Sequence, residues 1–592
     1  MRENRYNIFR RTTMIRKKLL IVVPLITVPL LAILLIAISC CSTNIFEPDI
    51  SIASKTISLR EYFGKEVKGK TLYLIKTNPF QTTIYASQTP YITQTSGIEL
   101  TKKENSNDYY AEEPSYATST KATHAVLPMI KASSVALEKR SNRVIDKAFI
   151  KDSQVEQIKA VEGETEKEIY IDSDSNISSY KSARAILRAI GENCYVWVID
   201  GFYYSDSTGS HNFTGDYAKY SYTSTSDEQL TQEQVKAFAN KFDEIYPLLQ
   251  DVFGKESDEI NYYSDGWIKK PMSYLSDTGT KVNIVLYDIG ADHSSDDSSG
   301  VLGYFYSRDY YPNGKHINEL GYDYSGSYSA LKYSNEGKYF YIDAYSAAAD
   351  PISAYSTIAH EAQHMISYGV KTLEKGIATT TAHEEMMSML CEDIFQTYLN
   401  VVNDESPEAR LPFFEGCYRY AGLEYRNESS NYAVLSYATN YAFASWLIRN
   451  FGGIDLIREM ARNDYEGISC IVSAVNRVNS ASYTINDLIT MYAKACVLHT
   501  YSYTHNKEVY DSTYPLRAID LWKLGDELSI NDEYVKQGYY SYTGCKLYDY
   551  NAKYDLRPYG MLLVKVGKIV SDEATINLEN TQSKAHYALV AE

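Results

Sequence analysis

The pattern of apolar and polar residues changes along the chain in blocks. Continuous apolar runs at 195–199, 282–287 and 338–343 are typical of buried strands. Between the first two runs, apolar residues recur every three or four positions over 230–253, and Gly254 follows them. This spacing predicts an amphipathic helix that ends at a glycine. The first part of the main fold is therefore expected to contain strands that bracket one long helix.

A second pattern begins near residue 350. Helical spacing dominates from there to about residue 495, whereas short alternating runs with polar turns occur at 43–123 and again after 501. This order predicts an α+β fold, with a mixed sheet followed by a helical subdomain and a β-rich domain at each end. The predicted divisions are a hydrophobic membrane-targeting segment at 1–39, an N-terminal β-rich domain at 40–150, a linker at 151–182, a central domain at 183–500 and a C-terminal β-rich domain at 501–592.

One pentapeptide, HEAQH at 360–364, offers candidate chemistry. On a helix, residues four positions apart project from one face, so His360 and His364 can reach one metal ion. Glu361 then points toward the open coordination position of that ion, where a general base is needed. The spacing predicts a metal site on a helix.

The local sequence supports that helix. Asp350 can cap its start, and Pro351 is tolerated at the first helical position. Gly369 is expected to end it.

A catalytic zinc ion needs a third protein ligand and one open position. A metzincin would place Gly and His three and six residues after the second histidine, but this chain has Ser367 and Val370 there. A gluzincin instead takes a glutamate from a following helix, and apolar residues at helical spacing over 382–394 predict such a helix. Three donors compete at its start: His383, Glu384 and Glu385.

Beyond the pentapeptide, the chain carries Glu385-x-x-Ser388-Met-Leu-x-Glu392-Asp393 and several shorter segments. With them, about 183–498 resembles the hyicolysin family of zinc metallopeptidases, in the thermolysin-like gluzincin clan. The resemblance implies a thermolysin-like catalytic domain with one zinc ion on His360, His364 and Glu385. It also implies that Tyr437 stabilises the oxyanion, with Tyr441 as the alternate. The shorter segments begin at Arg184, Tyr195, Phe242, Phe253 and Ser436.

Two positions depart from the family's pattern. The family usually has Asn-Glu-Gly around the third ligand, whereas this chain has Glu384-Glu385-Met386, so Glu384 can compete for the metal. Four residues after the ligand, the thermolysin branch has an acid that orients a zinc-bound histidine, and here that position is Met389. Glu392 and Asp393 lie about two turns away, and the sequence assigns neither to that role.

These residues together predict a zinc-dependent endopeptidase that acts on proteins and peptides. Zinc would lower the pKa of its bound water toward ~7, and Glu361 would take the water proton and pass it to the leaving amine. Residues 339–343 are expected to form the edge strand that pairs with an extended substrate. An aminopeptidase is disfavoured because no Gly-x-Met-Glu-Asn type of segment is present.

The N-terminus predicts export. Basic residues at 10–18 precede an uncharged stretch at 19–39, the layout of a targeting segment. The stretch ends in Ser39-Cys40-Cys41, which resembles a lipobox in which Cys40 or Cys41 is lipidated. An uncleaved N-terminal helix is the alternative anchor. Both anchors, the lipidated cysteine and the uncleaved helix, predict a membrane-anchored protein at the cell surface or facing the periplasm.

Composition and charge bear on the possible partners, the state of the cysteines and the alternative function. The net charge of -17, with no basic cluster after the first twenty residues, excludes a nucleic-acid partner. The six cysteines of the body form no dense framework, which favours buried free thiols. The 57 tyrosines and the β-rich flanks also suit a lipid-anchored adhesin or binding protein with a degenerate zinc site, which is the alternative function.

Overall fold

The computed structural model describes most of the chain beyond the first fifty residues. The described residues are 54–101, 127, 129–139, 154–172, 179–200, 202–206, 209–213, 230–289, 301–401, 406–424, 430–498, 500, 513–524, 544–579 and 584–592. The predicted targeting segment at 1–39 and both candidate lipidation sites, Cys40 and Cys41, lie outside them. None of the helices in the described ranges combines the length and the apolarity needed to span a membrane.

A six-stranded sheet packs against the helix that carries His360 and His364. Its order is β14-β16-β13-β8-β7-β6, and the three central strands β16, β13 and β8 run parallel. Helix α3 (Gln232–Phe253) connects β8 to β13, as parallel neighbours require a crossover. The three strands and the helix predicted from apolar spacing are thus confirmed. The strands are β6 (Glu166–Asp172), β7 (Tyr180–Ile190), β8 (Cys194–Asp200), β13 (Val282–Tyr287), β14 (Gly303–Phe305) and β16 (Tyr339–Asp343).

Two expectations about this sheet were wrong. Strand β16 is not the edge, because β14 pairs with it antiparallel on its outer side. Strand β14 has only three residues, too few for alternation to reveal it. The segment 151–182, expected to be a linker, contributes β6, which pairs with β7.

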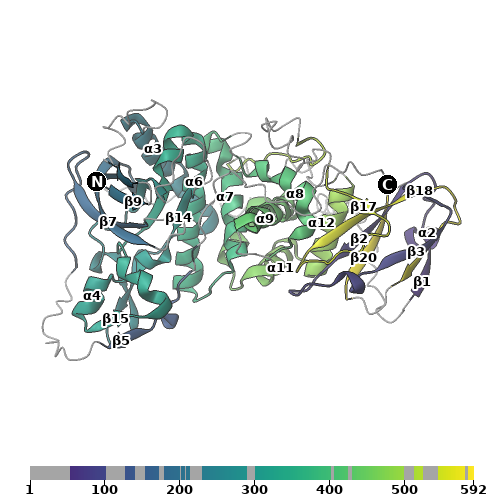
Figure 1. Ribbon diagram of the computed structural model, residues 1–592, viewed down its shortest axis with the longest axis horizontal. Helices are drawn as coiled ribbons and strands as arrows, with labels where there is room; N and C mark the ends of the chain where they lie inside the picture. Colours follow the sequence, from purple (N-terminus) through teal and green to yellow (C-terminus); the bar gives the residue numbers. More distant parts are fainter. Residues whose placement is uncertain are drawn as a thin grey trace, which may run out of the picture. The chain divides into compact units, whose positions relative to one another are not determined.

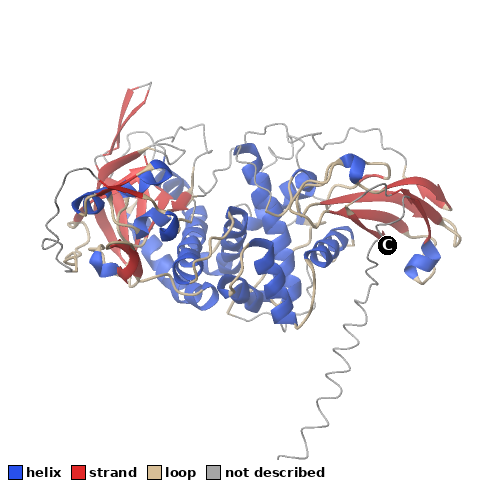
Figure 2. Cartoon of the chain, turned by 90° about the horizontal axis from the view of Figure 1, so that it is seen from below, coloured by secondary structure: helices blue, strands red, loops and turns tan. Residues whose placement is uncertain are grey.

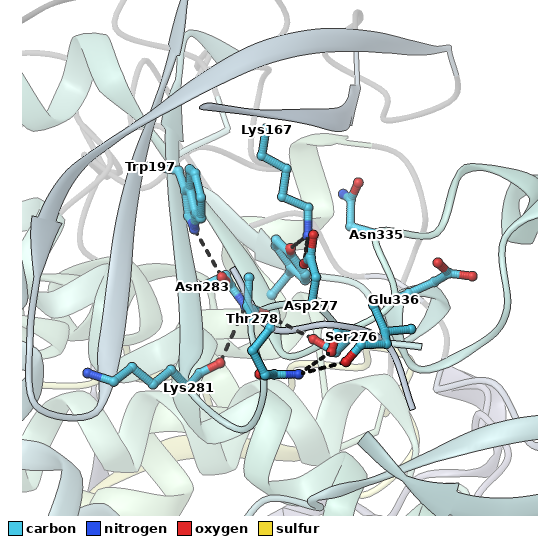
Figure 3. A network of polar contacts seen from close by, with 12 residues as sticks. Lys167, Trp197, Ser276, Asp277, Thr278, Lys281, Asn283, Asn335 and Glu336 are labelled. Atoms are coloured by element: carbon cyan, nitrogen blue, oxygen red, sulfur yellow. Dashed lines mark hydrogen bonds and ion pairs between the residues drawn. The ribbon is translucent and has the colours of Figure 1, made fainter. Parts of the chain in front are cut away.

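Neutral polar groups hold the amino-terminal ends of β13 and β16 (Figure 3). The indole of Trp197 donates to Asn283 Oδ1 at 2.9 Å, and Asn283 Nδ2 donates to Thr278 Oγ1 at 2.9 Å and to the carbonyl of Lys338 at 3.1 Å. Because Asn283 is fully buried, these bonds satisfy groups that water cannot reach. The network fixes the strands from which the helical region continues.

Helices dominate from 344 to 497. Helix α6 packs against α7, α3 and the strands β14 and β16, and α7 packs in turn against α9 (Figure 1). The helices are α5 (Ala344–Ala349), α6 (Pro351–Ser367), the π-helical segment η9 (Tyr368–Glu374), α7 (Thr381–Leu399), α8 (Leu411–Cys417), α9 (Ser430–Phe451), α10 (Gly453–Arg462), α11 (Gly467–Asn479) and α12 (Ile485–Val497). The described residues are mixed α and β, which agrees with the predicted α+β class.

Gly369 does not end the helix, contrary to expectation, because the helical path continues through η9 to Glu374. A Cβ at Gly369 would lie 2.6 Å from the backbone nitrogen of Ser257 and 3.0 Å from Glu256 Cα. The glycine is therefore required for a close backbone approach, which no local sequence signal reveals.

Strands from the two ends of the chain share sheets. In Figure 1 purple β2 lies between yellow β18 and β20, and β19 lies between β1 and β3. The C-terminus ends in this group of strands (Figure 2). The predicted domain boundaries stay a prediction, but the two flanking segments do not form separate sheets. The strands are β1 (Ser54–Ser58), β2 (Thr71–Thr77), β3 (Tyr91–Ser96), β4 (Ile98–Leu100), β17 (Tyr548–Asp549), β18 (Met561–Ile569), β19 (Thr575–Glu579) and β20 (His586–Ala591).

The described part also contains short ribbons and helices. The ribbons pair β5 (Leu137–Lys139) with β15 (Tyr322–Tyr324), β9 (Phe202–Asp206) with β10 (Gly209–Phe213), and β11 (Glu259–Tyr263) with β12 (Trp267–Pro271). The short helices are α2 (Leu59–Phe63) and α4 (Gly314–Glu319). The six body cysteines are buried free thiols, as expected.

Candidate metal centre

Two packed helices supply the candidate site, and both begin as capped helices. Asp350 precedes α6 and accepts a hydrogen bond from the backbone N–H of Ser353 at 3.2 Å, with Pro351 in the first turn. Thr380 caps α7 in the same way and accepts from the N–H of His383 at 3.4 Å. The predicted start of α6, the helix that carries His360 and His364, is confirmed.

The side chains of His360, His364 and Glu385 converge between α6 and α7. One ligand atom from each residue lies within 4.8 Å of the others. Glu385 Oε2 lies 3.1 Å from His360 Nε2, and Glu385 Oε1 lies 3.4 Å from His364 Nε2. All three residues are buried. Across the described ranges, no other group of three or more His, Cys, Asp or Glu has this spacing.

The electrostatics of the group favour a positive charge between the helices. Burial alone would raise the pKa of Glu385, but His364 and His360 hold it well below its usual value. Burial alone would lower the pKa of His364, but Glu385 and Glu384 raise it well above its usual value. Each partner thus stabilises the charged form of the other.

Glu361 lies beside this group and contacts the edge strand β14. It is fully buried, and the backbone N–H of Phe305 in β14 donates to its carboxylate. Burial raises the pKa of Glu361 to about 7, although the nearby imidazoles of His360 and His364 lower it. A carboxyl group with a pKa near neutrality can both accept and release a proton.

Glu392 orients the first histidine, a role that the sequence left unassigned. Its Oε1 lies 2.7 Å from His360 Nδ1, on the side of the ring away from Glu385. Its Oε2 accepts from Ser356 Oγ at 3.0 Å and lies 3.6 Å from Arg410 Nη1. Since Glu392 follows Glu385 by two helical turns, the spacing of seven was the available signal for a shared face. No comparable spacing in the sequence indicated that Arg410 lies near this group.

The other two donors that competed with Glu385 lie outside the group of three. Glu384 Oε2 is 3.6 Å from Nδ1 of His364, whereas Glu385 faces Nε2. His383 is buried, and burial lowers its pKa to about 4. The geometry therefore favours Glu385 as the third donor.

The two candidate tyrosines have other contacts in the structure. The ring of Tyr437 lies over the guanidinium of Arg410, 5.9 Å from ring centroid to carbon. The hydroxyl of Tyr441 donates to Asp393 Oδ2 at 3.1 Å. Tyr437 is thus connected to the centre through Arg410 and Glu392, while Tyr441 belongs to a different buried cluster.

Asp393 and Met389 serve packing rather than the centre. Asp393 accepts from Arg449 Nη1 at 2.7 Å and from Nη2 at 2.9 Å, and all of these atoms are buried. Met389 is fully buried in the core. The acid at Nδ1 of His360 is instead Glu392.

The residues present fit a divalent metal ion. Two imidazole nitrogens and a carboxylate oxygen form the donor set of many catalytic zinc sites. Glu385 Oε1 is buried and accepts no hydrogen bond from the described residues. Four carboxylates, those of Glu361, Glu384, Glu385 and Glu392, surround two imidazoles, so a bound cation would balance the local charge.

The described residues thus combine a mixed α and β fold with a buried His-His-Glu group that could hold a metal ion. The chain is similar to a neutral metalloprotease, ShpI of Staphylococcus hyicus, with 24% identity over 280 residues. The aligned region covers 45% of this chain and 54% of the relative, so the chain spans about half the length of that protein. No family model matches the chain. The comparison supports a relationship to metalloproteases and, at this coarse level, a protein-hydrolysing function.

Proposed function

We propose that the protein is a zinc-dependent endopeptidase of the hyicolysin type. His360, His364 and Glu385 are the proposed ligands, and Glu361 is the proposed general base. The observation that supports this most is the convergence of the three ligand atoms within 4.8 Å, beside a buried glutamate. The remote similarity to a neutral metalloprotease points the same way.

Zinc is the proposed ion because two nitrogens and one oxygen, with one position left open, suit it better than they suit calcium or magnesium. When bound, the ion supplies Lewis acidity, which polarises a carbonyl group and makes a water molecule more acidic. Glu392 holds His360 in orientation from the far side of the ring at 2.7 Å.

Glu361 moves the protons in this proposal. Its carboxylate accepts a proton from the attacking water and delivers it to the nitrogen of the leaving amine. Burial raises the pKa of Glu361 above that of an exposed carboxyl group, which makes its carboxylate a better proton acceptor. The N–H of Phe305 fixes one carboxylate oxygen, which orients the group.

The proposed substrate is an extended segment of a protein. Strand β14 is the edge of the six-stranded sheet, and it packs against α6, which carries the histidines. An extended peptide that pairs with the outer edge of β14 would be held mainly by its backbone. Such binding tolerates many sequences.

Tyr437 remains the proposed donor to the oxyanion, a role carried by the family resemblance. If it acts there, Tyr437→Phe keeps the metal ion and lowers kcat by about 10²–10³-fold. Unchanged turnover in that variant would remove Tyr437 from the mechanism.

Export and membrane anchoring are proposals that rest on the N-terminal sequence. The basic segment, the uncharged stretch and the Cys40-Cys41 pair support an anchored lipoprotein, with an uncleaved helix as the alternative. Mass spectrometry of the purified N-terminus distinguishes the two, because only lipidation adds acyl chains.

Glu361→Gln tests the function. The variant should retain zinc and lose cleavage of unfolded casein by about 10²–10⁴-fold, because the amide cannot accept the water proton. Glu374→Gln removes one carboxylate from an exposed residue at the end of η9 and should behave as wild type. Equal casein cleavage by Glu361→Gln and wild type would rule out Glu361 as the general base.

A further inference from the structure

The imidazole of His364 lies between the carboxylates of two consecutive residues. Its Nε2 is 3.4 Å from Glu385 Oε1, and its Nδ1 is 3.6 Å from Glu384 Oε2. His360 has the corresponding arrangement, with Glu385 at Nε2 and Glu392 at Nδ1. Each histidine of the centre therefore has a separate carboxylate on the side of the ring that faces away from Glu385.

Glu384 is held firmly in this position. Its Oε1 accepts from Ser367 Oγ at 2.8 Å, at the end of α6, and also from the hydroxyl of Thr379, just before α7. The residue is 3% exposed, and its Oε2 has no hydrogen-bond partner among the described residues. One oxygen is thus anchored and the other is left to face His364.

Ser388 is the competing partner for His364, but its position is poor for that role. Its Oγ is 3.2 Å from Nδ1 and 3.3 Å from Nε2, so it lies almost equally far from both nitrogens and along neither N–H direction. Its proton is directed to Gln363 Oε1 at 2.5 Å. The group that faces Nδ1 with a full negative charge is Glu384.

We propose that Glu384 is a positioning residue for His364, whose negative charge keeps the imidazole proton on Nδ1 and leaves the Nε2 lone pair for the metal ion. The inference rests on the proposed metal site and deepens it. A separation of 3.6 Å is longer than a formed hydrogen bond, so Glu384 acts through its charge in a buried site where charges are poorly screened. An asparagine, which the family usually has here, would lack this charge.

Metal affinity tests the proposal without reference to turnover. Full-length wild type, Glu384→Gln, Glu384→Asp and Ser388→Ala are loaded with Co²⁺ or Zn²⁺, and affinity is measured by competition with a chelator. Glu384→Gln should still bind one ion but roughly 10–100-fold more weakly, as expected for loss of an outer partner of a metal-bound histidine. Glu384→Asp, which keeps the charge, should recover part of that loss, and Ser388→Ala should change affinity less than Glu384→Gln.

The controls separate this role from the alternatives. Glu374→Gln removes an exposed carboxylate and should leave affinity unchanged. The visible absorption of the Co²⁺ form should keep the wild-type band pattern in Glu384→Gln, because the set of ligands is the same. Thermal unfolding in excess chelator shows whether each metal-free variant is folded.

Four results would overturn the proposal. They are wild-type affinity in Glu384→Gln, an equal loss in Glu384→Asp, a larger loss in Ser388→Ala, and complete loss of stoichiometric binding in Glu384→Gln, which would make Glu384 a ligand. A wild-type chain that binds no ion would instead defeat the proposed function itself, and so the two failures are distinguishable.

Discussion

Helix α7 places buried acids against two neighbours, and the two sides differ in charge balance. On the side facing α9, Asp393 receives two hydrogen bonds from Arg449 and one from Tyr441. On the side facing α6, Glu385 and Glu392 meet the imidazole of His360. We call these the arginine face and the imidazole face.

The difference shows what each face is for. A buried carboxylate paired with arginine is already compensated, so the arginine face contributes to holding α7 and α9 together. The imidazole face has more carboxylates than permanent cations, so the rest of its positive charge must come from protonated histidines or from a bound cation. A bound metal ion would complete such a face. Substitutions on the arginine face should therefore change stability, and substitutions on the imidazole face should change metal affinity.

Arg449→Met should give the largest change on the arginine face. It leaves Asp393 buried without its cation, which should lower the free energy of unfolding by about 3–5 kcal/mol. Urea denaturation of the full chain measures the effect. Arg477→Met is the control, because that ion pair with Glu459 is exposed on its arginine side and should contribute less than about 1 kcal/mol. A loss below about 1 kcal/mol in Arg449→Met would contradict a structural arginine face.

Glu392→Gln should weaken metal binding by about 10–100-fold, because the amide cannot balance a proton on His360 Nδ1. Chelator competition measures the affinity. The neighbouring substitution Asp393→Asn is the matched comparison, and it should lower stability while the folded protein keeps its metal affinity. If both variants lost affinity equally, the two faces would not be distinct.

Tyr441→Phe should have the smallest effect, a loss of about 1–2 kcal/mol of stability from one hydrogen bond to a charged group. Turnover should not change, since the hydroxyl donates to Asp393 on the arginine face. Reduced kcat with unchanged stability would instead identify Tyr441, rather than Tyr437, as the donor to the oxyanion.

Much of the centre could be predicted because helical periodicity is local. A spacing of four residues placed His360 and His364 together, and the family resemblance selected Glu385, which the structure brings to both. The start of α6 followed from Asp350 in the same way. These features depend only on residues within a few turns of one another.

The features that could not be predicted depend on distant partners. Glu392 and Asp393 are adjacent in sequence, yet one meets α6 and the other α9, and periodicity does not say which helix lies on which side. The requirement for Gly369 comes from backbone at Glu256, more than a hundred residues away. Alternation likewise revealed strands such as β2 and β18, but not that they pair with each other.

Metal content before and after loss of Glu385 tests the central claim most directly. Full-length wild type and Glu385→Gln are purified, dialysed against metal-free buffer and analysed for bound metals. The account predicts about one zinc ion per wild-type chain and almost none in Glu385→Gln, with both proteins folded. Equal metal content in the two proteins, or none in wild type, would contradict it, and a metal-free wild type would favour a binding protein with a degenerate site.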